Sequence, residues 1–298
     1  MRKSVIVKIS IFLLISLQSC KEKSPAVPEL ISMPEVNYMY EAKDNDTNKK
    51  ITIFINAYYI SNEITNRQYR EFTDWAKNHP EETLFKSKEV IARSYPESGK
   101  KLVYNLPWPT KVSDLLPTLI DSIALYKIDK RFKNYFTDSR FDDYPVVGVS
   151  RNAAEYYCRW LNLVQIETKT NRVKVKGQLL PAKVTTATNS IGTYRLPSEL
   201  EWQDVSNHQY KRRFQNDYSL HRVTEGVSNV RSIYHINDNV SEWVISESDT
   251  LALSRGRNWF EKEIAIEQYW LHPDSSNGYT GFRIAVTYEP ESNKKQNK

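Results

Sequence analysis

Two cysteines are the strongest nucleophiles available to this chain of 298 residues. Cys20 follows Leu17-Gln18-Ser19 at the end of an apolar N-terminal run, whereas Cys158 falls among apolar residues at helical spacing. Nothing in the sequence puts a cation or a second thiol beside Cys158, which predicts a buried core residue rather than a reactive thiolate.

Five histidines could bind a transition metal, but they are widely spaced and none forms a His-x-x-x-His pair. They are His79, His208, His221, His235 and His272. A three-histidine site assembled by the fold stays open, although scattered histidines in a tyrosine-rich domain are more often surface or core residues. The sequence also shows no signature of a Ser-His-Asp triad or of a glycine-rich phosphate loop.

The N-terminus has the pattern of a signal peptide. Three basic residues precede an apolar run, Ile9–Leu17, which is too short to cross a bilayer as a stable helix. Leu17-Gln18-Ser19-Cys20 resembles the lipobox of bacterial lipoproteins. We therefore predict a signal peptide at 1–19 and a membrane anchor through a lipid on Cys20, which would leave no partner for a disulfide with Cys158. An ordinary signal peptide with an incidental cysteine is the alternative.

Charge and composition argue against nucleic-acid binding. Without residues 1–19 the 42 basic residues fall to 39 against 36 acidic ones, a net charge of +3. So small an excess is not the basic footprint of a nucleic-acid-binding protein. The 19 tyrosines and 7 tryptophans instead indicate a folded, aromatic-rich protein.

Two capping boxes mark the expected starts of helices. Thr65 and Gln68 form the first, and the apolar residues that follow recur at helical spacing until just before Pro80. Ser198 and Glu201 form the second, directly after a strand signal. Each helix should begin where a short side chain accepts a backbone N–H.

The residues around the second capping box have the character of rigid supports. We expect Arg195 and Glu201 to be buried or half-buried polar links, and Trp202 to be an anchor in a core shared with Trp243. Such rigidity could frame an active site. Without reactive groups nearby, it would serve folding alone.

The chain is expected to divide into a tether, one folded domain and a tail. Pro25, Pro28 and Pro34 are typical of a spacer, and the β-branched run Ile51–Ile55 begins the folded part. Scattered Lys, Asp and Pro after the first helix indicate an insertion. The expected divisions after the signal peptide are a flexible tether at 20–48, a folded domain at 49–288 with an insertion at 77–143, and a disordered tail at 289–298.

Three further segments are expected to be β-structure. Tyr144–Val149 predicts a short buried strand, followed by a helix that Ser150 caps. Alternation of Thr, Lys and Val over Val164–Gly192, clearest at Arg172–Lys176, predicts a solvent-facing hairpin. Gly281–Val286 predicts a closing strand.

Six short motifs follow one another in the order of the formylglycine-generating enzyme family, also called the sulfatase-modifying-factor domain, which the chain resembles over residues 50–287. Each motif is weak by itself, but six in order are strong. They are Glu63-Ile64-Thr65-Asn66; Pro145-Val146 with Ala153-Ala154, Tyr157-Cys158 and Trp160-Leu161; Arg195 to Glu199 with Glu201-Trp202; Asn239-Val240 with Glu242-Trp243; Arg255-Gly256; and Gly281-Phe282-Arg283. The resemblance implies an α+β fold of the sulfatase-modifying-factor type, related to C-type lectins, with a small twisted antiparallel sheet, two main helices and much irregular structure.

The family's chemistry depends on groups that this chain does not carry. The family includes copper-dependent oxidases, iron-dependent sulfoxide synthases and members without chemistry, so the fold alone does not decide the function. The resemblance implies that an oxidase needs one thiol directly after Arg283, where this chain has Ile284, and another downstream of Arg255-Gly256, where it has no cysteine. A Cu(I) site requires soft ligands. We therefore expect no enzyme activity.

A structural calcium is the one cofactor that the resemblance leaves open. In the family a loop glutamate and backbone carbonyls hold the ion, with an Asp or Asn upstream. Here Glu242 and the backbone of Val240 match that pattern. Asp238 replaces a glycine but offers a carboxylate, whereas His235 replaces the upstream oxygen ligand. The alternative is that Glu242 caps or forms a salt bridge within the core.

Within the family, the chain looks most like the gliding-motility lipoproteins GldK and GldJ of the type IX secretion machinery. This resemblance rests on the lipobox, the segments 63–72 and 144–149, and an insertion that contains Leu106-Pro107-Trp108-Pro109. It implies a non-catalytic outer-membrane lipoprotein, on the periplasmic face rather than the cell surface, that acts as a scaffold with protein partners and forms a homo-oligomer or ring. A divergent metal-dependent oxidase of the family and a glycan-binding, lectin-like module are the alternatives.

Overall fold

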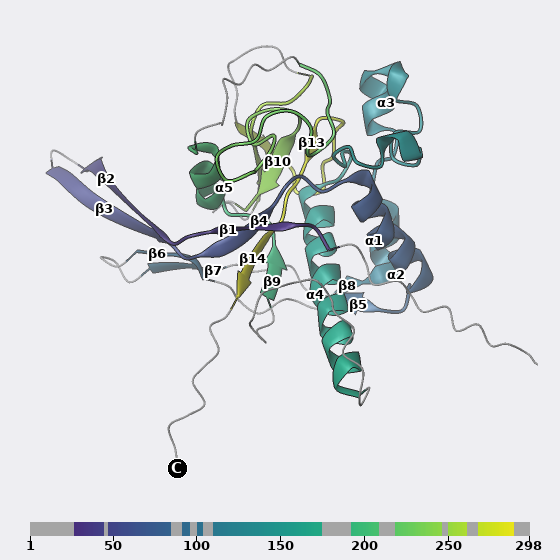
Figure 1. Ribbon diagram of the computed structural model, residues 1–298, viewed down its shortest axis with the longest axis horizontal. Helices are drawn as coiled ribbons and strands as arrows, with labels where there is room; N and C mark the ends of the chain where they lie inside the picture. Colours follow the sequence, from purple (N-terminus) through teal and green to yellow (C-terminus); the bar gives the residue numbers. More distant parts are fainter. Residues whose placement is uncertain are drawn as a thin grey trace, which may run out of the picture.

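The computed structural model describes residues 27–44, 47–84, 91–95, 100–103, 110–174, 192–208, 218–245, 250–260 and 268–288. These residues form a mixed α+β domain with small, mainly antiparallel sheets and few helices (Figure 1), which confirms the expected fold class. The expected signal peptide, Cys20 and the tail at 289–298 lie outside the described residues. Within the described ranges, no helix is long and apolar enough to cross a membrane.

The strands form three small sheets and one short pair in the described part of the chain. The central sheet is antiparallel, in the order β1 (Leu30–Met33), β4 (Tyr58–Ser61), β14 (Ala285–Tyr288) and β9 (Gly192–Arg195). The second has the order β12 (Gln268–Leu271), β11 (Ala252–Arg255), β10 (Ser241–Val244) and β13 (Thr280–Gly281), with β10 and β13 parallel. The third has the order β2 (Val36–Asp44), β3 (Thr47–Ile55), β6 (Ile91–Tyr95) and β7 (Lys100–Val103), and β5 (Thr83–Leu84) pairs with β8 (Thr110–Lys111).

Helix α1 (Asn66–Asn78) begins at the predicted capping box. Thr65 Oγ1 accepts the N–H of Gln68 over 3.2 Å, and Gln68 Oε1 accepts the N–H of Thr65 over 3.0 Å. Its buried residues lie on the face that the apolar spacing predicts, and the helix ends before Pro80. Its buried residues are Asn66, Tyr69, Phe72, Thr73 and Ala76.

Helix α4 (Arg151–Lys174) begins at Ser150, whose Oγ accepts the N–H of Ala153 over 3.1 Å, as predicted. Cys158 lies on its inner face with 2% of its surface exposed. The helix runs on to Lys174, so the hairpin expected over 164–192 is wrong over residues 164–174, while 175–191 lie outside the described ranges. A helix that has formed gains one hydrogen bond with each added residue, which outweighs a weak alternating pattern.

The segment 77–143 is less irregular than an insertion was expected to be. It contains α2 (Val112–Leu115), α3 (Ala124–Ile128) and the 3-10 turns Leu116–Thr118, Lys130–Phe132 and Ser139–Phe141, besides β5 to β8. Leu115 and Leu119 are buried in the main core, and Tyr69 of α1 donates its hydroxyl to the carbonyl of Leu119 over 2.8 Å. This segment therefore helps to build the core rather than only decorating it.

Strand β1 lies inside the segment that we expected to be a flexible tether at 20–48. Leu30 pairs with Ser61 and Met33 with Tyr58, and Met33 is fully buried. Pro28 and Pro34 flank this strand, which is at the edge of the central sheet, where a proline removes no ladder hydrogen bond. The folded domain therefore begins earlier than residue 49.

Two segments expected to be strands are buried but interrupted. Tyr144–Val149 makes a single bridge, between Pro145 and Thr65, because Gly148 turns the chain with φ +78°. A Cβ at Gly148 would lie 2.3 Å from the carbonyl oxygen of Asp121, so only glycine fits. The expected closing strand is divided into β13 and β14 by the residues between Gly281 and Ala285.

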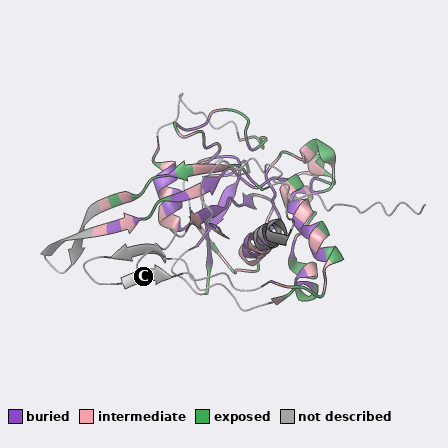
Figure 2. Ribbon diagram, turned by 60° about the horizontal axis from the view of Figure 1, so that its bottom comes forward, coloured by how far each residue is buried: buried purple, intermediate pink, exposed green. Residues whose placement is uncertain are grey.

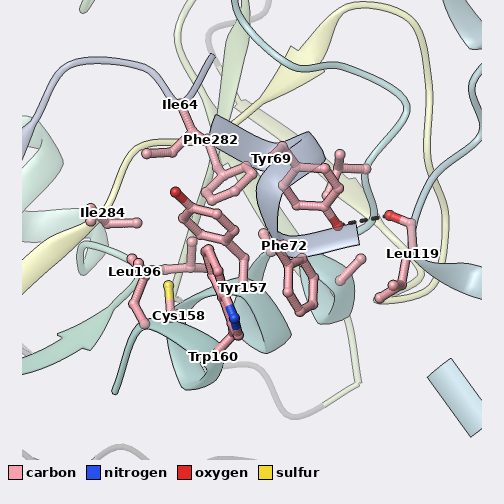
Figure 3. Packing of buried hydrophobic residues seen from close by; sticks show 14 of the residues in the cluster. Ile64, Tyr69, Phe72, Leu119, Tyr157, Cys158, Trp160, Leu196, Phe282 and Ile284 are labelled. Atoms are coloured by element: carbon pink, nitrogen blue, oxygen red, sulfur yellow. Dashed lines mark hydrogen bonds between the residues drawn. The ribbon is translucent and has the colours of Figure 1, made fainter. Parts of the chain in front are cut away.

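The largest hydrophobic cluster lies between α1, α4 and the strands (Figure 3). The rings of Tyr69, Phe72, Tyr157 and Phe282 pack with centroids 5.5 to 5.9 Å apart, in mostly edge-to-face contacts. Figure 2 shows the buried residues gathered on the central strands and the inner helix faces. The motif residues described below are attached to this core.

Candidate functional site

An arginine and a glutamate of the third motif meet where β9 runs into α5 (Glu199–Ser206). Arg195 Nη1 donates to Glu201 Oε2 over 2.7 Å, and Arg195 Nη2 donates to Glu201 Oε1 over 2.6 Å. The side chains are 3% and 2% exposed. The structure thus places both residues as buried polar links.

The same glutamate completes the second predicted capping box, which is confirmed. Ser198 Oγ accepts the N–H of Glu201 over 3.1 Å, and Glu201 Oε2 accepts the N–H of Ser198 over 2.7 Å. Arg195 Nη2 also donates to Thr287 Oγ1 of β14 over 2.9 Å. This first ion pair is therefore embedded in further local hydrogen bonds.

A second buried ion pair joins the fourth and sixth motifs. Arg283 Nε donates to Glu242 Oε2 over 2.6 Å, and Arg283 Nη2 donates to Glu242 Oε1. Arg283 Nη1 also donates to the carbonyl of Ser61 over 3.0 Å, and Nη2 donates to the carbonyl of Tyr234 over 3.2 Å. Neither charged side chain is more than 1% exposed, so the ion pair is closed off from solvent.

Trp202 and Trp243 lie in different hydrophobic clusters, which corrects the expectation of one shared core. Successive residues of a strand point to opposite faces, so Trp243 enters the main cluster while Glu242 and Val244 face the cluster that contains Trp202. Trp202 Nε1 donates to Glu242 Oε2 over 2.7 Å. The link between the two motifs is a hydrogen bond to the glutamate.

Glu63 brings the first motif to the same place. Asn239 Nδ2 donates to Glu63 Oε2 over 2.7 Å, and Asn239 Oδ1 accepts the N–H of His221 over 2.8 Å. Asn239 is 1% exposed and takes a positive φ of 64°, where asparagine is among the favoured residues. Sequence reasoning gave Glu63 no role. The signal available was a charged residue set directly before an apolar residue and a helix cap.

Burial dominates the electrostatics of the two glutamates. It raises the pKa of the Glu63 carboxyl well above its ordinary value, and the negative charge of Glu242 raises that pKa further, whereas Arg283 opposes the shift. Burial also raises the pKa of Glu242, against the charge and hydrogen bonds of Arg283. Glu63 Oε1 makes no hydrogen bond with the described part of the chain.

His235 and Asp238 bond to each other in the loop before β10. His235 Nδ1 lies 3.1 Å from Asp238 Oδ1, and both residues are 4% exposed. The His235 ring stacks on His221 with centroids 5.8 Å apart and planes 5° apart. The carboxylate of Asp238 is therefore turned towards its own loop.

The remaining motif residues fix close approaches. Arg255 forms an ion pair with Glu199 of α5. Gly256 has φ +89°, and its carbonyl accepts the hydroxyl of Ser241 over 2.9 Å. A Cβ at Gly281 would lie 2.6 Å from the carbonyl oxygen of Val146. These positions bring strands and helix together without adding a reactive group.

The sequence matches the family described as the sulfatase-modifying factor enzyme 1-like domain (FGE-sulfatase) over residues 17–235. The chain belongs to this family. The match confirms the family resemblance, and the segment that holds Asn239, Glu242 and Arg283 lies beyond its end.

Three solved structures are similar to this chain of the sulfatase-modifying factor family. PvdO from Pseudomonas aeruginosa shares 15% identity with a TM-score of 0.47, over 87% of this chain and 94% of that one. CarF shares 13% with a TM-score of 0.45, over 88% and 99%. Treponema denticola variable protein 1 shares 15% with a TM-score of 0.43, over 86% and 94%. Similarities this distant carry no argument about function. No curated protein matches the chain.

The residues present do not fit the two-thiol copper site of the family's oxidases. Ile284 is fully buried and packs in the main cluster. Burial raises the pKa of the Cys158 thiol, and the charge of Glu155 acts in the same direction, so the thiolate is disfavoured. The sequence contains one other cysteine, Cys20, in the N-terminal region.

The five histidines are not gathered into an iron site. His208 accepts from Arg231 Nε over 2.8 Å, His79 stacks on Trp75, and the side chain of His272 is 69% exposed. His221 and His235 stack together, but the described residues contain no group of three or more His, Cys, Asp or Glu that could hold a metal ion.

The donor set of the expected calcium site does not fit either. Glu242 Oε2 accepts hydrogen bonds from Arg283 and Trp202, and Oε1 accepts one from Arg283. Asp238 is engaged by His235. Both expected carboxylate ligands, Glu242 and Asp238, are therefore already engaged by side chains of this chain.

Proposed function

We propose that this chain is a non-catalytic, membrane-anchored member of the sulfatase-modifying factor family. The observation that carries the proposal is the cysteine inventory: the sequence has two cysteines, one buried in the core at Cys158 and one at the expected lipidation site, Cys20. A two-thiol copper centre would have no thiol ligands here, because one cysteine is buried and the other is the expected lipidation site. The motif residues lie instead in buried ion pairs and close backbone contacts.

More specifically, we propose that the chain is a scaffold or assembly component of a gliding-motility or type IX secretion complex, of the GldK and GldJ type. The lipobox at Cys20 supports an outer-membrane lipoprotein, with the periplasmic face as the proposed side. A lipid anchor confines the domain beside the membrane, which raises the effective concentration of membrane-bound partners. The proposed partners are proteins of the complex, with self-association into a homo-oligomer or ring.

A row of aromatic rings supports a protein-binding role. Phe132 of the inserted segment contacts Trp259, Trp259 contacts Phe260, and Phe260 stacks on Tyr279, each with centroids 5.8 Å apart. Phe260, which lies between Trp259 and Tyr279 in this row, is 48% exposed. Exposed aromatic side chains on a rigid support are enriched at protein interfaces. We propose that this aromatic row forms part of the contact face.

Crosslinking in isolated membranes tests the proposal. The wild type should yield crosslinked adducts, and Phe260→Ser should lose most of them while keeping its melting temperature. Ile123→Ser is a matched control, because Ile123 is 53% exposed in the turn before α3 and lies outside the aromatic row. Recovery of the wild type only as a monomer would contradict the scaffold role. Stoichiometric iron or copper in the purified mature protein would favour the oxidase alternative.

A further inference from the structure

The loop before Trp243 supplies its own charge partners at the place where the family resemblance implies a calcium ion. We infer that the His235–Asp238 hydrogen bond replaces that ion in a loop whose glutamate, Glu242, is already bound by Arg283, so that this domain folds without a divalent cation. The inference rests on which donors already occupy the expected ligands, and it is independent of the scaffold role.

The first step concerns the glutamate that would hold the ion. Calcium binds carboxylate oxygens at about 2.3–2.6 Å and needs several oxygen ligands turned towards one point. The carboxylate of Glu242 is instead turned towards the guanidinium of Arg283, which bonds to both of its oxygens, and Trp202 adds a third donor. A calcium ion at this carboxylate would face the positive charge of Arg283 at close range in a buried setting.

The second step concerns the two positions that depart from the family pattern. His235 stands where the pattern has an oxygen ligand, and Asp238 stands where it has a glycine. The structure brings these two departures into contact, with Nδ1 and Oδ1 3.1 Å apart. Each explains the other: the histidine satisfies the added carboxylate, and the carboxylate orients a ring that could not ligate calcium.

The third step is that the pair is enclosed. His235 and Asp238 are each 4% exposed, and the His221 ring covers the His235 ring with planes 5° apart. The competing arrangement is a calcium ion held by the Glu242 carboxylate and the backbone of the loop, as the family resemblance implies. The two arrangements predict opposite responses to calcium.

Thermal unfolding of the mature chain in EDTA, in calcium and in magnesium separates them. We expect the same melting temperature in all three. A calcium ion that binds the folded state at a concentration about 100-fold above its Kd would raise the melting temperature by about 5 °C or more. A calcium-specific rise of that size would overturn the inference.

A double-mutant cycle tests the pair directly. His235→Asn and Asp238→Gly should each lower the melting temperature, and the double variant should lose several degrees less than the sum of the single losses, because it restores a loop without an unpaired carboxylate. Additive losses would overturn the inference. The exposed pair His272 and Asp274, 3.8 Å apart, is the matched control, and His272→Asn with Asp274→Gly should be additive. If a variant does not fold, the wild type in calcium still decides.

Discussion

The two buried ion pairs differ in how far along the chain they reach. Arg195 and Glu201 are 6 residues apart and join a strand to the helix that follows it, whereas Glu242 and Arg283 are 41 residues apart and join β10 to the segment between β13 and β14. Both pairs exclude water. The short-range pair is one bond in a local network, and the long-range pair is the point at which distant segments meet. We expect the loss of the long-range pair to cost more stability.

Their neighbours explain the difference. Glu201 keeps the N–H of Ser198 if its arginine is lost, so its charge would still be partly satisfied. Glu242 would keep one donor, Trp202 Nε1, while the carbonyl of Ser61 would lose Arg283 Nη1 and the carbonyl of Tyr234 would lose Arg283 Nη2. Removing one partner of a buried pair is costly because the other charge is left without compensation.

The largest predicted effect tests the long-range pair. Arg283→Met should lower the free energy of unfolding by about 4–5 kcal/mol, since it leaves Glu242 buried beside an apolar chain. Urea unfolding monitored by tryptophan fluorescence measures the change. Arg131→Met is the control, because the Arg131 side chain is 83% exposed, and it should change the value by less than about 0.5 kcal/mol.

The next prediction tests the short-range pair. Arg195→Met should cost about 3 kcal/mol, and less than Arg283→Met in the same assay, because the capping bonds of Glu201 remain. An equal or larger loss of unfolding free energy would contradict the comparison, because the capping bonds would then not stabilise the buried Glu201.

Glu63, which lies beside the long-range pair, gives a prediction of opposite sign. Its folded-state pKa is raised well above the ordinary value of a glutamate, so the stability that the neutral carboxyl contributes is fully present below that ordinary pKa and is lost as the pH rises through the folded pKa. Glu63→Gln mimics the neutral acid and should raise the free energy of unfolding at about pH 8 by about 1 kcal/mol or more. The free energy of unfolding in urea should fall less steeply between about pH 5 and pH 8 for the variant than for the wild type. A variant less stable than wild type at the upper end would contradict this account.

The smallest predicted effect concerns the cap that supports the short-range pair. Ser198→Ala removes one accepted N–H at the start of α5 and should cost about 1 kcal/mol. Ser113→Ala is the control, since Ser113 is exposed and bonds to its neighbour Asp114. A cost as large as that of Arg195→Met would mean that the cap and the ion pair act as one unit.

What the sequence could predict follows the same division between short and long range. Both capping boxes and the buried faces of the helices were predictable, because each pattern is complete within a few residues. The contact of Glu63 with Asn239 spans 176 residues, and no local pattern encodes it. The motifs containing Glu242 and Arg283 were identified, but their ion pair stood only as an alternative to a calcium ligand.

Local signals also misled where tertiary contacts decide. The prolines around Leu30–Met33 are typical of a spacer, yet they flank an edge strand that pairs with β4. The valines near Tyr144 suggested a strand, but Gly148 bends the chain and its close approach to Asp121 prevents regular pairing. In both cases a partner far along the chain sets the conformation.

The position of β1 limits how far the domain can lie from a lipid on Cys20 (Figure 1). The expected tether, which ends at residue 48, could place the domain about 95 Å from a lipid on Cys20, whereas one that ends at Leu30 reaches at most about 35 Å. With the proposed lipid in place, the edge of the central sheet at Leu30 would stay within about 35 Å of that lipid. A partner in the same membrane would then meet the domain beside the bilayer.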